Sequence, residues 1–147
     1  MADAERVMKI GEVAERTGLS LRTIRHYDET GLVTPSARTT GGFRMYTELE
    51  VARLLVIKRM KPLDYTLEEM AGLLDTLDGL GGSWMPDSDR AYQAAERPGD
   101  REAYLQRLDD YISDAQARLA RLRERAAMGE EFTKTLQYQA ERHRQTD

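Results

Sequence analysis

Apolar residues repeat with coiled-coil spacing through one C-terminal segment of this 147-residue chain. Steps of three and four residues alternate without a break along the series Leu105, Leu108, Ile112, Ala115, Leu119, Leu122 and Ala126. This alternation is typical of a coiled coil, because the apolar stripe of an ordinary amphipathic helix is wider. A helix over residues 101–127 would be roughly 40 Å long, and so narrow a stripe cannot be buried inside so short a chain. We therefore predict that these residues form a dimerisation seam with an identical chain.

The N-terminal part carries the local signals of two short helices joined by a tight turn. The segment IGEVAERTG begins at Ile10 and ends at Gly18, which suits the left-handed residue after a helix. Ser20 is a candidate N-cap for the next segment, LRTIRHYDETG, which Gly31 closes. Two helices with a glycine-containing turn between them indicate a helix-turn-helix unit.

The segment after this unit predicts a small β-hairpin and two further helices. LVTPSARTTGGFRMY, residues 32–46, holds a glycine pair between β-prone pieces and is typical of a wing. A capping box over 47–50 opens a helix through about Met60, which Pro62 interrupts. A second capping box over 66–69 opens a helix whose inward face would be Leu67, Met70, Leu73, Leu74 and Leu77.

Composition changes divide the rest of the chain. We expect a flexible tail over 1–7, a winged helix-turn-helix domain over 8–78, a linker over 79–100 with a short helix near 89–95, and a coiled-coil helix with a C-terminal tail over 101–147. Past Gly129 the register weakens, so the helix either continues or folds back there. The fold class is mainly α.

Charge is unevenly distributed along this acidic chain. The net charge is −4, but residues 16–61 hold nine Lys or Arg against four Asp or Glu, leaving +5 there and −9 elsewhere. Such asymmetry indicates a phosphate-seeking surface on one part of the protein, or chance clustering. With no run of about 18 apolar residues and no leader pattern, we expect a cytoplasmic, nucleoid-associated protein with no membrane contact.

Three blocks of residues together resemble the MerR family of transcriptional regulators. They are IGEVAERTGLSLRTIRHYDETGLVTPSART (10–39), GGFRMYTELEVARL (41–54) and DYTLEEMAGLL (64–74), in the family's order. The resemblance implies a winged helix-turn-helix domain and a homodimer joined through an antiparallel coiled coil. Two departures stand out: His26 replaces a common tyrosine, and residues 61–64 (KPLD) replace a glycine-containing approach to the fourth helix.

The outward face of the second helix offers side chains that suit a major groove, where arginine binds guanine bidentately. The resemblance maps Arg22, Arg25, His26 and Tyr27 onto DNA-contacting positions. The wing would add phosphate contacts, so the complete predicted set is Ser20, Arg22, Thr23, Arg25, His26, Tyr27, Arg38, Arg44, Tyr46 and Lys61.

Alternatives remain for several of these residues. Tyr27 either contacts DNA or packs against the wing, and Arg25 either contacts a base or pairs with Asp28 or Glu29. For Phe43 we favour a place in the core of the wing over DNA contact. The three cations Arg53, Lys58 and Arg59 fit a solvated helix face.

The resemblance also implies a mechanism. Such dimers bind a palindromic operator in a promoter with an unusually long spacer, and they distort that spacer so that RNA polymerase engages indirectly, through the DNA. A simple repressor fits the same residues. An excisionase-like architectural DNA-bending protein and a protein-binding adaptor are the alternatives. We do not expect this protein to be an enzyme, since the sequence holds no nucleophile–base pair or phosphate-binding glycine loop.

The inducing signal is not specified by the sequence. The absence of cysteine excludes thiolate metal sites and cysteine redox switches, and we expect no metal site and no cofactor. A small apolar ligand could dock near Trp84, Met85, Tyr92, Phe132 and Tyr138. We favour the alternative that these aromatic residues pack the linker against the coiled coil.

Overall fold

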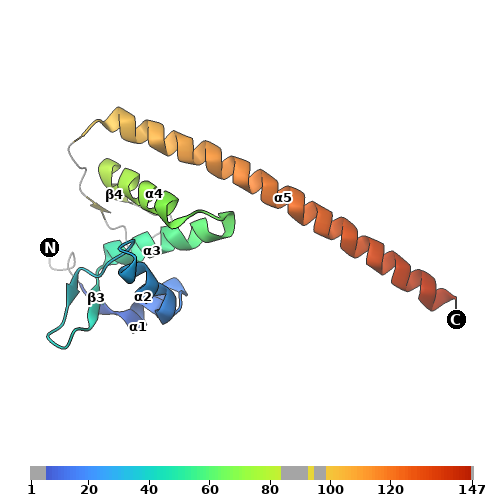
Figure 1. The fold of residues 1–147 in the computed structure, drawn as a ribbon, viewed down its shortest axis with the longest axis horizontal. Helices are drawn as coiled ribbons and strands as arrows, with labels where there is room; N and C mark the ends of the chain where they lie inside the picture. The colour runs from blue at the N-terminus through green and yellow to red at the C-terminus, as the bar shows by residue number, and fades with distance from the viewer. Residues whose placement is uncertain (1–5, 84–92, 95–98, 147) are drawn as a thin grey trace. The chain divides into compact units, whose positions relative to one another are not determined.

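The computed structural model describes residues 6–83, 93–94 and 99–146. The chain forms two compact units, residues 1–109 and 110–147. Figure 1 labels the five α-helices and the strands β3 and β4. The elements in chain order are β1 (Met8–Lys9), α1 (Ile10–Thr17), α2 (Leu21–Glu29), β2 (Ala37–Arg38), β3 (Arg44–Tyr46), α3 (Glu48–Met60), the 3₁₀ helix η2 (Lys61–Leu63), α4 (Leu67–Leu80), β4 (Gly82–Ser83), β5 (Gln93–Ala94) and α5 (Arg101–Gln145). The described chain is therefore mainly helical, as predicted.

The helix-turn-helix unit forms with the predicted caps. Gly18 ends α1 with a φ of 74° and donates its N–H to the Ala14 carbonyl, a left-handed turn that glycine adopts without strain. Ser20 begins α2, and its Oγ accepts a hydrogen bond of 3.0 Å from the Thr23 N–H. Val13 of α1 and Ile24 of α2 are fully buried, together with residues of α3. This shared core fixes the two helices against each other.

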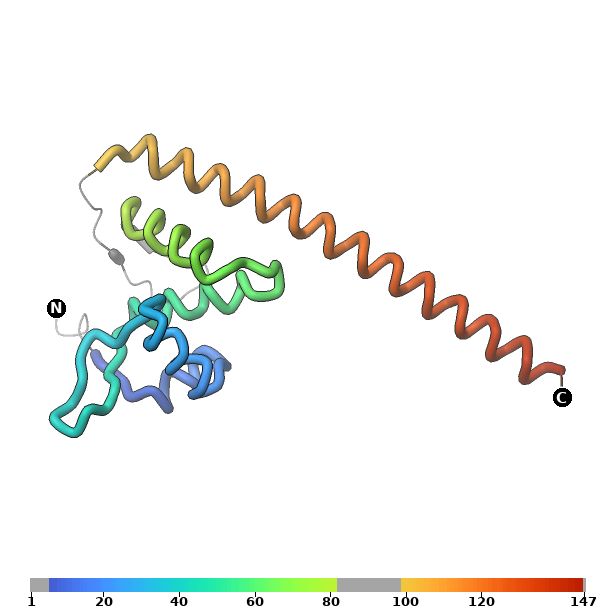
Figure 2. The backbone as a smooth tube through the Cα atoms, viewed as in Figure 1, coloured from blue at the N-terminus to red at the C-terminus, as the bar shows by residue number. Residues whose placement is uncertain are grey.

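The wing is part of a three-stranded antiparallel sheet with the order β1-β3-β2. In Figure 2 the hairpin between β2 and β3 extends as a narrow loop away from the helices. Thr39 N–H donates to the Phe43 carbonyl at 2.9 Å, and Gly42 turns the chain with a φ of 84°. The third strand, β1, pairs Met8 with Tyr46 and was not predicted, because two residues are too few to show an alternating pattern.

The helices after the wing begin and end close to their predicted positions. Thr47 precedes α3, but its hydroxyl donates to the Glu50 carboxylate instead of capping a backbone N–H, so the first predicted capping box is wrong. The second box at Thr66 and Glu69 forms with both of its hydrogen bonds. Between them, Asp64 adopts a left-handed conformation with a φ of 60°, at the place where the sequence lacks the expected glycine.

Residues between α4 and α5 differ from the predicted linker. Helix α4 runs through Leu80 and so includes the first two residues of the segment predicted as linker. Gln93–Ala94 pairs with Gly82–Ser83 as an antiparallel strand, so the helix predicted near 89–95 is wrong at these two positions. Its remaining residues, and Trp84, Met85 and Tyr92, lie outside the described residues.

Helix α5 is one uninterrupted helix of 45 residues, about 68 Å at 1.5 Å per residue. It continues through Gly129, which settles the alternative left open by the sequence. None of its residues is buried. Within the described residues, no helix combines the length and the hydropathy needed to span a bilayer.

Candidate nucleic-acid interface

Helix α2 separates an inner apolar face from an outer basic face. Ile24 and Tyr27 are buried, whereas Arg22, Arg25 and His26 are exposed. Neither arginine has an ion pair or hydrogen bond with any residue that the structure describes, so the alternative pairing of Arg25 with Asp28 or Glu29 does not form. Both guanidinium groups are therefore available to a ligand.

Two predicted DNA-contacting tyrosines belong to the core instead. Tyr46 is 0% exposed, and its hydroxyl has no hydrogen-bond partner among the described residues. The prediction that its phenol holds a phosphate is wrong for this conformation. Tyr27 is 3% exposed, which agrees with the packing alternative. Burial raises the pKa of both phenols.

Asp28 links helix α2 to the wing. Its Oδ2 accepts hydrogen bonds from Arg44 Nε at 2.5 Å and from Arg38 Nη2 at 2.8 Å. Burial acts to raise the pKa of Asp28, but the hydrogen bonds from Arg44 and Arg38 outweigh it, and the pKa lies below its ordinary value. Arg38 and Arg44 are thus fixed beside α2, with one excess positive charge between the three side chains.

Replacing this carboxylate tests the link. Asp28→Asn should lower the free energy of unfolding by about 1–3 kcal/mol near neutral pH, because a neutral amide replaces the charged acceptor of both arginine hydrogen bonds. Since the folded-state pKa lies below the ordinary 3.8, the contribution of Asp28 is complete above the unfolded pKa and is lost as pH falls through the folded pKa. Urea unfolding between about pH 7 and pH 3 measures both effects.

The neighbouring carboxylate provides the matched control. Glu29 lies on the same helix, is exposed and makes no hydrogen bond with the described residues. Glu29→Gln should leave both stability and its acid dependence nearly unchanged. An Asp28→Asn protein with wild-type stability at both ends of the pH series would contradict the proposed link.

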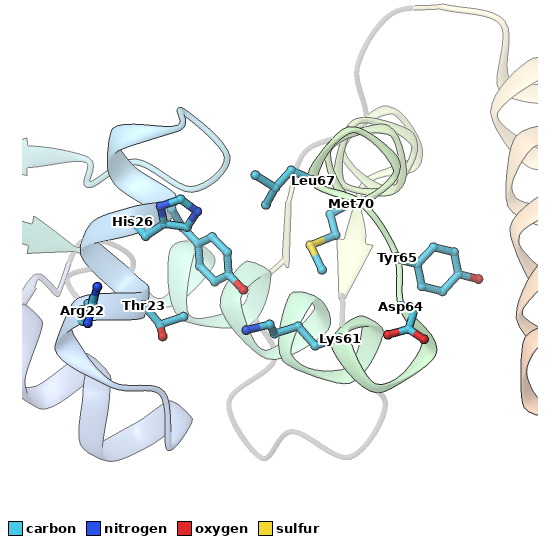
Figure 3. Close-up of a pocket in the computed structure, with 9 residues that line it drawn as sticks. Arg22, Thr23, His26, Lys61, Asp64, Tyr65, Leu67 and Met70 are labelled. Atoms are coloured by element: carbon cyan, nitrogen blue, oxygen red, sulfur yellow. The ribbon is translucent and has the colours of Figure 1, made fainter. Parts of the chain in front are cut away.

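A pocket of about 530 Å³ lies between α2 and the segment that leads into α4. Its lining combines basic, polar and apolar side chains from α2, η2 and α4: Arg22, Thr23, His26, Tyr27, Lys61, Asp64, Tyr65, Leu67 and Met70. In Figure 3 the Lys61 side chain extends toward α2, while Leu67 and Met70 lie on the α4 side. Leu67 is 40% exposed, so its predicted inward position is wrong. The pocket brings Lys61 together with the predicted α2 residues.

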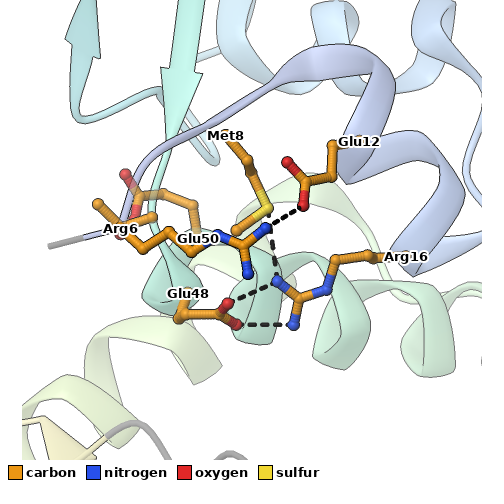
Figure 4. A network of polar contacts seen from close by, with 7 residues as sticks. Arg6, Met8, Glu12, Arg16, Glu48 and Glu50 are labelled. Carbon is orange, nitrogen blue, oxygen red and sulfur yellow. Dashed lines mark hydrogen bonds and ion pairs between the residues drawn. The ribbon is translucent and has the colours of Figure 1, made fainter. Parts of the chain in front are cut away.

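Other cations of the basic segment hold the fold together. Arg16 binds Glu48 with two hydrogen bonds of 2.6 and 2.7 Å, which join α1 to α3. Figure 4 shows this fork beside the Arg6–Glu12 ion pair. Lys58 Nζ donates to the Thr17 carbonyl at 2.7 Å, and Arg53 pairs with Asp78. The interpretation as a solvated face is therefore wrong for Arg53, which is only partly exposed, whereas Lys58 is exposed as predicted and also holds the Thr17 carbonyl.

The wing presents one aromatic residue that the sequence interpretation placed in its core. Phe43 is 67% exposed, beside Gly41 near the hairpin turn. That interpretation is wrong, because a hairpin of such short strands has no interior large enough for a phenyl ring. Its place directly after the glycine pair, at the turn of the predicted hairpin, is the sequence signal that could have indicated its exposure.

The predicted dimerisation residues stay accessible in the single chain. Ile112 and Leu119 are exposed, and the others are partly or fully exposed: Leu105, Leu108, Ala115, Leu122 and Ala126. Phe132 and Tyr138 are also exposed on α5. Within the part of the chain that the structure describes, no group of three or more His, Asp or Glu could hold a metal ion.

Comparison with known proteins agrees with these features. A model of the MerR HTH family regulatory protein matches residues 8–77. Over 70 residues the chain is 44% identical to the mercuric resistance operon regulatory protein of Bacillus cereus, a match covering 48% of this chain and 53% of that protein. The chain thus matches about half the length of this relative.

Two solved structures share the fold across most of both chains. A MerR-family regulator from Bacillus thuringiensis has a TM-score of 0.60 and 20% identity, covering 92% of this chain and 99% of that one. HiNmlR, a MerR family regulator lacking the sensor domain and bound to promoter DNA, has a TM-score of 0.56 and 18% identity, covering 85% and 86%. Residues 8–77 therefore form a MerR-type HTH domain, and the chain shares the fold of MerR-family regulators.

Proposed function

We propose that this protein is a sequence-specific transcriptional regulator, not an enzyme, that binds a palindromic promoter operator as a homodimer. The observation that carries the proposal is the outer face of α2, where Arg22 and Arg25 have no partner among the described residues. Arginine in this position can donate two hydrogen bonds to guanine O6 and N7. The protein acts on chromosomal DNA in the cytoplasm.

The flanking residues supply backbone contacts on both sides of α2. Arg38 and Arg44 are fixed on one side by Asp28, and Lys61 lies on the other side of the pocket. Ser20, Thr23 and His26 complete the surface, and Phe43 adds an apolar contact at the wing. Contacts of this kind set the register of a protein on the duplex, while base contacts provide specificity.

The dimer is assigned to an antiparallel coiled coil of α5. Its seam residues repeat at alternating steps of three and four, and the single chain buries none of them. HiNmlR, which shares the fold, is bound to promoter DNA. By analogy the dimer distorts the promoter spacer, so that RNA polymerase is affected through the DNA.

Selection from a random duplex library with the full-length protein tests the proposal. We expect one palindromic sequence to be enriched, and footprinting to show protection of two half-sites on one face of the DNA. Tandem coverage that spreads along the duplex would instead support an excisionase-like architectural role. Enrichment of no sequence at physiological salt would contradict sequence-specific binding.

Lys61 should contribute a measurable share of the salt dependence. On duplex DNA each phosphate contact adds about 0.9 to the slope of log K against log salt, so Lys61→Ala should reduce the slope of the dimer by about 2. Arg121→Ala, which removes an exposed cation from α5, is the control and should leave the slope unchanged. An equal slope for the Lys61→Ala protein and the wild type would remove Lys61 from the interface.

A further inference from the structure

The first turn of α5 packs against the end of α4, where the aromatic ring of Tyr104 contacts Gly79. The Tyr104 ring lies so close to Gly79 that a Cβ atom there would be 2.4 Å from Cε1 and Cζ. Real Cβ atoms essentially never come within 3.0 Å of another heavy atom. Gly79 is buried within α4, where glycine destabilises a helix relative to alanine. The space that the Tyr104 ring requires explains why a glycine stands at position 79 of α4.

Further contacts fix the same pair of helices. Arg107 Nη1 binds Asp75 Oδ2 at 3.3 Å, and its guanidinium lies 5.9 Å from the centroid of the Tyr104 ring. Asp75 and Gly79 are one turn apart on α4, and Tyr104 and Arg107 are one turn apart on α5. Two contacts one turn apart define a direction for the helix axis as well as a position. These residues all belong to the compact unit that contains the helix-turn-helix.

We propose that Gly79 and Tyr104 are positioning residues that set the half-site spacing the dimer accepts on DNA. The inference rests on the proposed function. Helix α5 continues without a break from Tyr104 into the seam residues that pair the two chains. The Tyr104 contact therefore fixes the start of the seam, Leu105 and Leu108, against α4 within the unit that contains the helix-turn-helix.

The expected displacement matches the spacing of base pairs. An alanine at 79 requires the ring to move by roughly 1 Å to reach ordinary contact, at 3.4 Å or more. If the ring keeps its rotamer, the backbone of α5 moves with it, and over one helical turn of about 5.4 Å such a shift tilts the axis by roughly 10°. At Ala115, about 17 Å along the helix, that tilt moves the axis by about 3 Å, close to the 3.4 Å rise of one base pair.

A series of operators tests the proposal. The selected palindrome is rebuilt with one or two base pairs added to or removed from the centre, and the affinity of full-length variants is measured for each duplex. Gly79→Ala should move the preferred spacing by about one base pair and weaken binding at the original spacing about tenfold. Its affinity for a single half-site, and its dimeric state in sedimentation, should stay unchanged.

The chain offers a matched control on α5. Gly129 is also a helical glycine, but a Cβ there would meet nothing within 4 Å. Gly129→Ala should keep the original spacing preference. A folded, dimeric Gly79→Ala protein with the wild-type preference would overturn the proposal.

Variants of Tyr104 test the same role in half-site spacing even if the Gly79→Ala protein does not fold. Tyr104→Ala removes the ring and should broaden the range of accepted spacings, while Tyr104→Phe keeps the ring and should retain the original preference. An unchanged, narrow preference in Tyr104→Ala would also overturn the proposal. If the wild type itself selects no palindrome, the proposed function is wrong. A wild type that selects a palindrome, with variants that keep its spacing preference, would contradict only the role of Gly79 and Tyr104.

Discussion

Leu108→Asp combined with Leu119→Asp should convert the protein to a monomer. Two carboxylates per chain would lie in the centre of the apolar seam, where burying an unpaired charge is costly. Sedimentation should then give a mass of 16.8 kDa in place of twice that value. Operator affinity should fall by about 10²–10⁴-fold, because two linked half-site contacts become one.

The control places the same charges on another face of the same helix. Ser113→Asp and Ala120→Asp add two carboxylates at exposed positions seven residues apart, both next to seam residues in sequence but outside the three-four series. That protein should remain dimeric and bind the operator. A Leu108→Asp/Leu119→Asp protein that stays dimeric would show that a different surface joins the chains.

Features that depend on near neighbours in sequence were predicted well. The Ser20 cap, the Gly18 turn and the Thr66–Glu69 capping box each involve residues within four positions of one another, so the sequence shows both partners together. The three-four series in α5 is local in the same sense. The Thr47–Glu50 box is the exception among these local signals, because the Glu50 carboxylate accepts hydrogen bonds from Thr47 and from the more distant Ser36.

Features that depend on distant residues were missed or misassigned. Asp28 was considered as a partner for Arg25, three residues away, but it binds Arg38 and Arg44 across the wing. Tyr46 was assigned to DNA because its type suits phosphate binding, yet its pairing with Met8 of β1 places it in the core. Residue type indicates what a side chain can bind, but tertiary packing decides whether it is exposed.

Specificity should depend chiefly on two side chains of α2. Arg22→Ala combined with Arg25→Ala removes both exposed guanidinium groups from the outer face of the recognition helix. If each donates two hydrogen bonds to a guanine, the specific operator should lose about 1–3 kcal/mol per residue, or about 2–6 kcal/mol together. The double variant should therefore bind the operator with an affinity reduced roughly 30-fold to 20,000-fold.

Stability should not explain this loss, since neither arginine has a hydrogen-bond or ion-pair partner among the described residues. The matched control, Arg121→Ala with Arg142→Ala, removes the same charge from exposed positions of α5. Titration of the operator and of a scrambled duplex at one salt concentration separates the two effects, because lost phosphate contacts weaken both duplexes alike. If the double α2 variant still prefers the operator over the scrambled duplex by the wild-type ratio, other residues must recognise the bases.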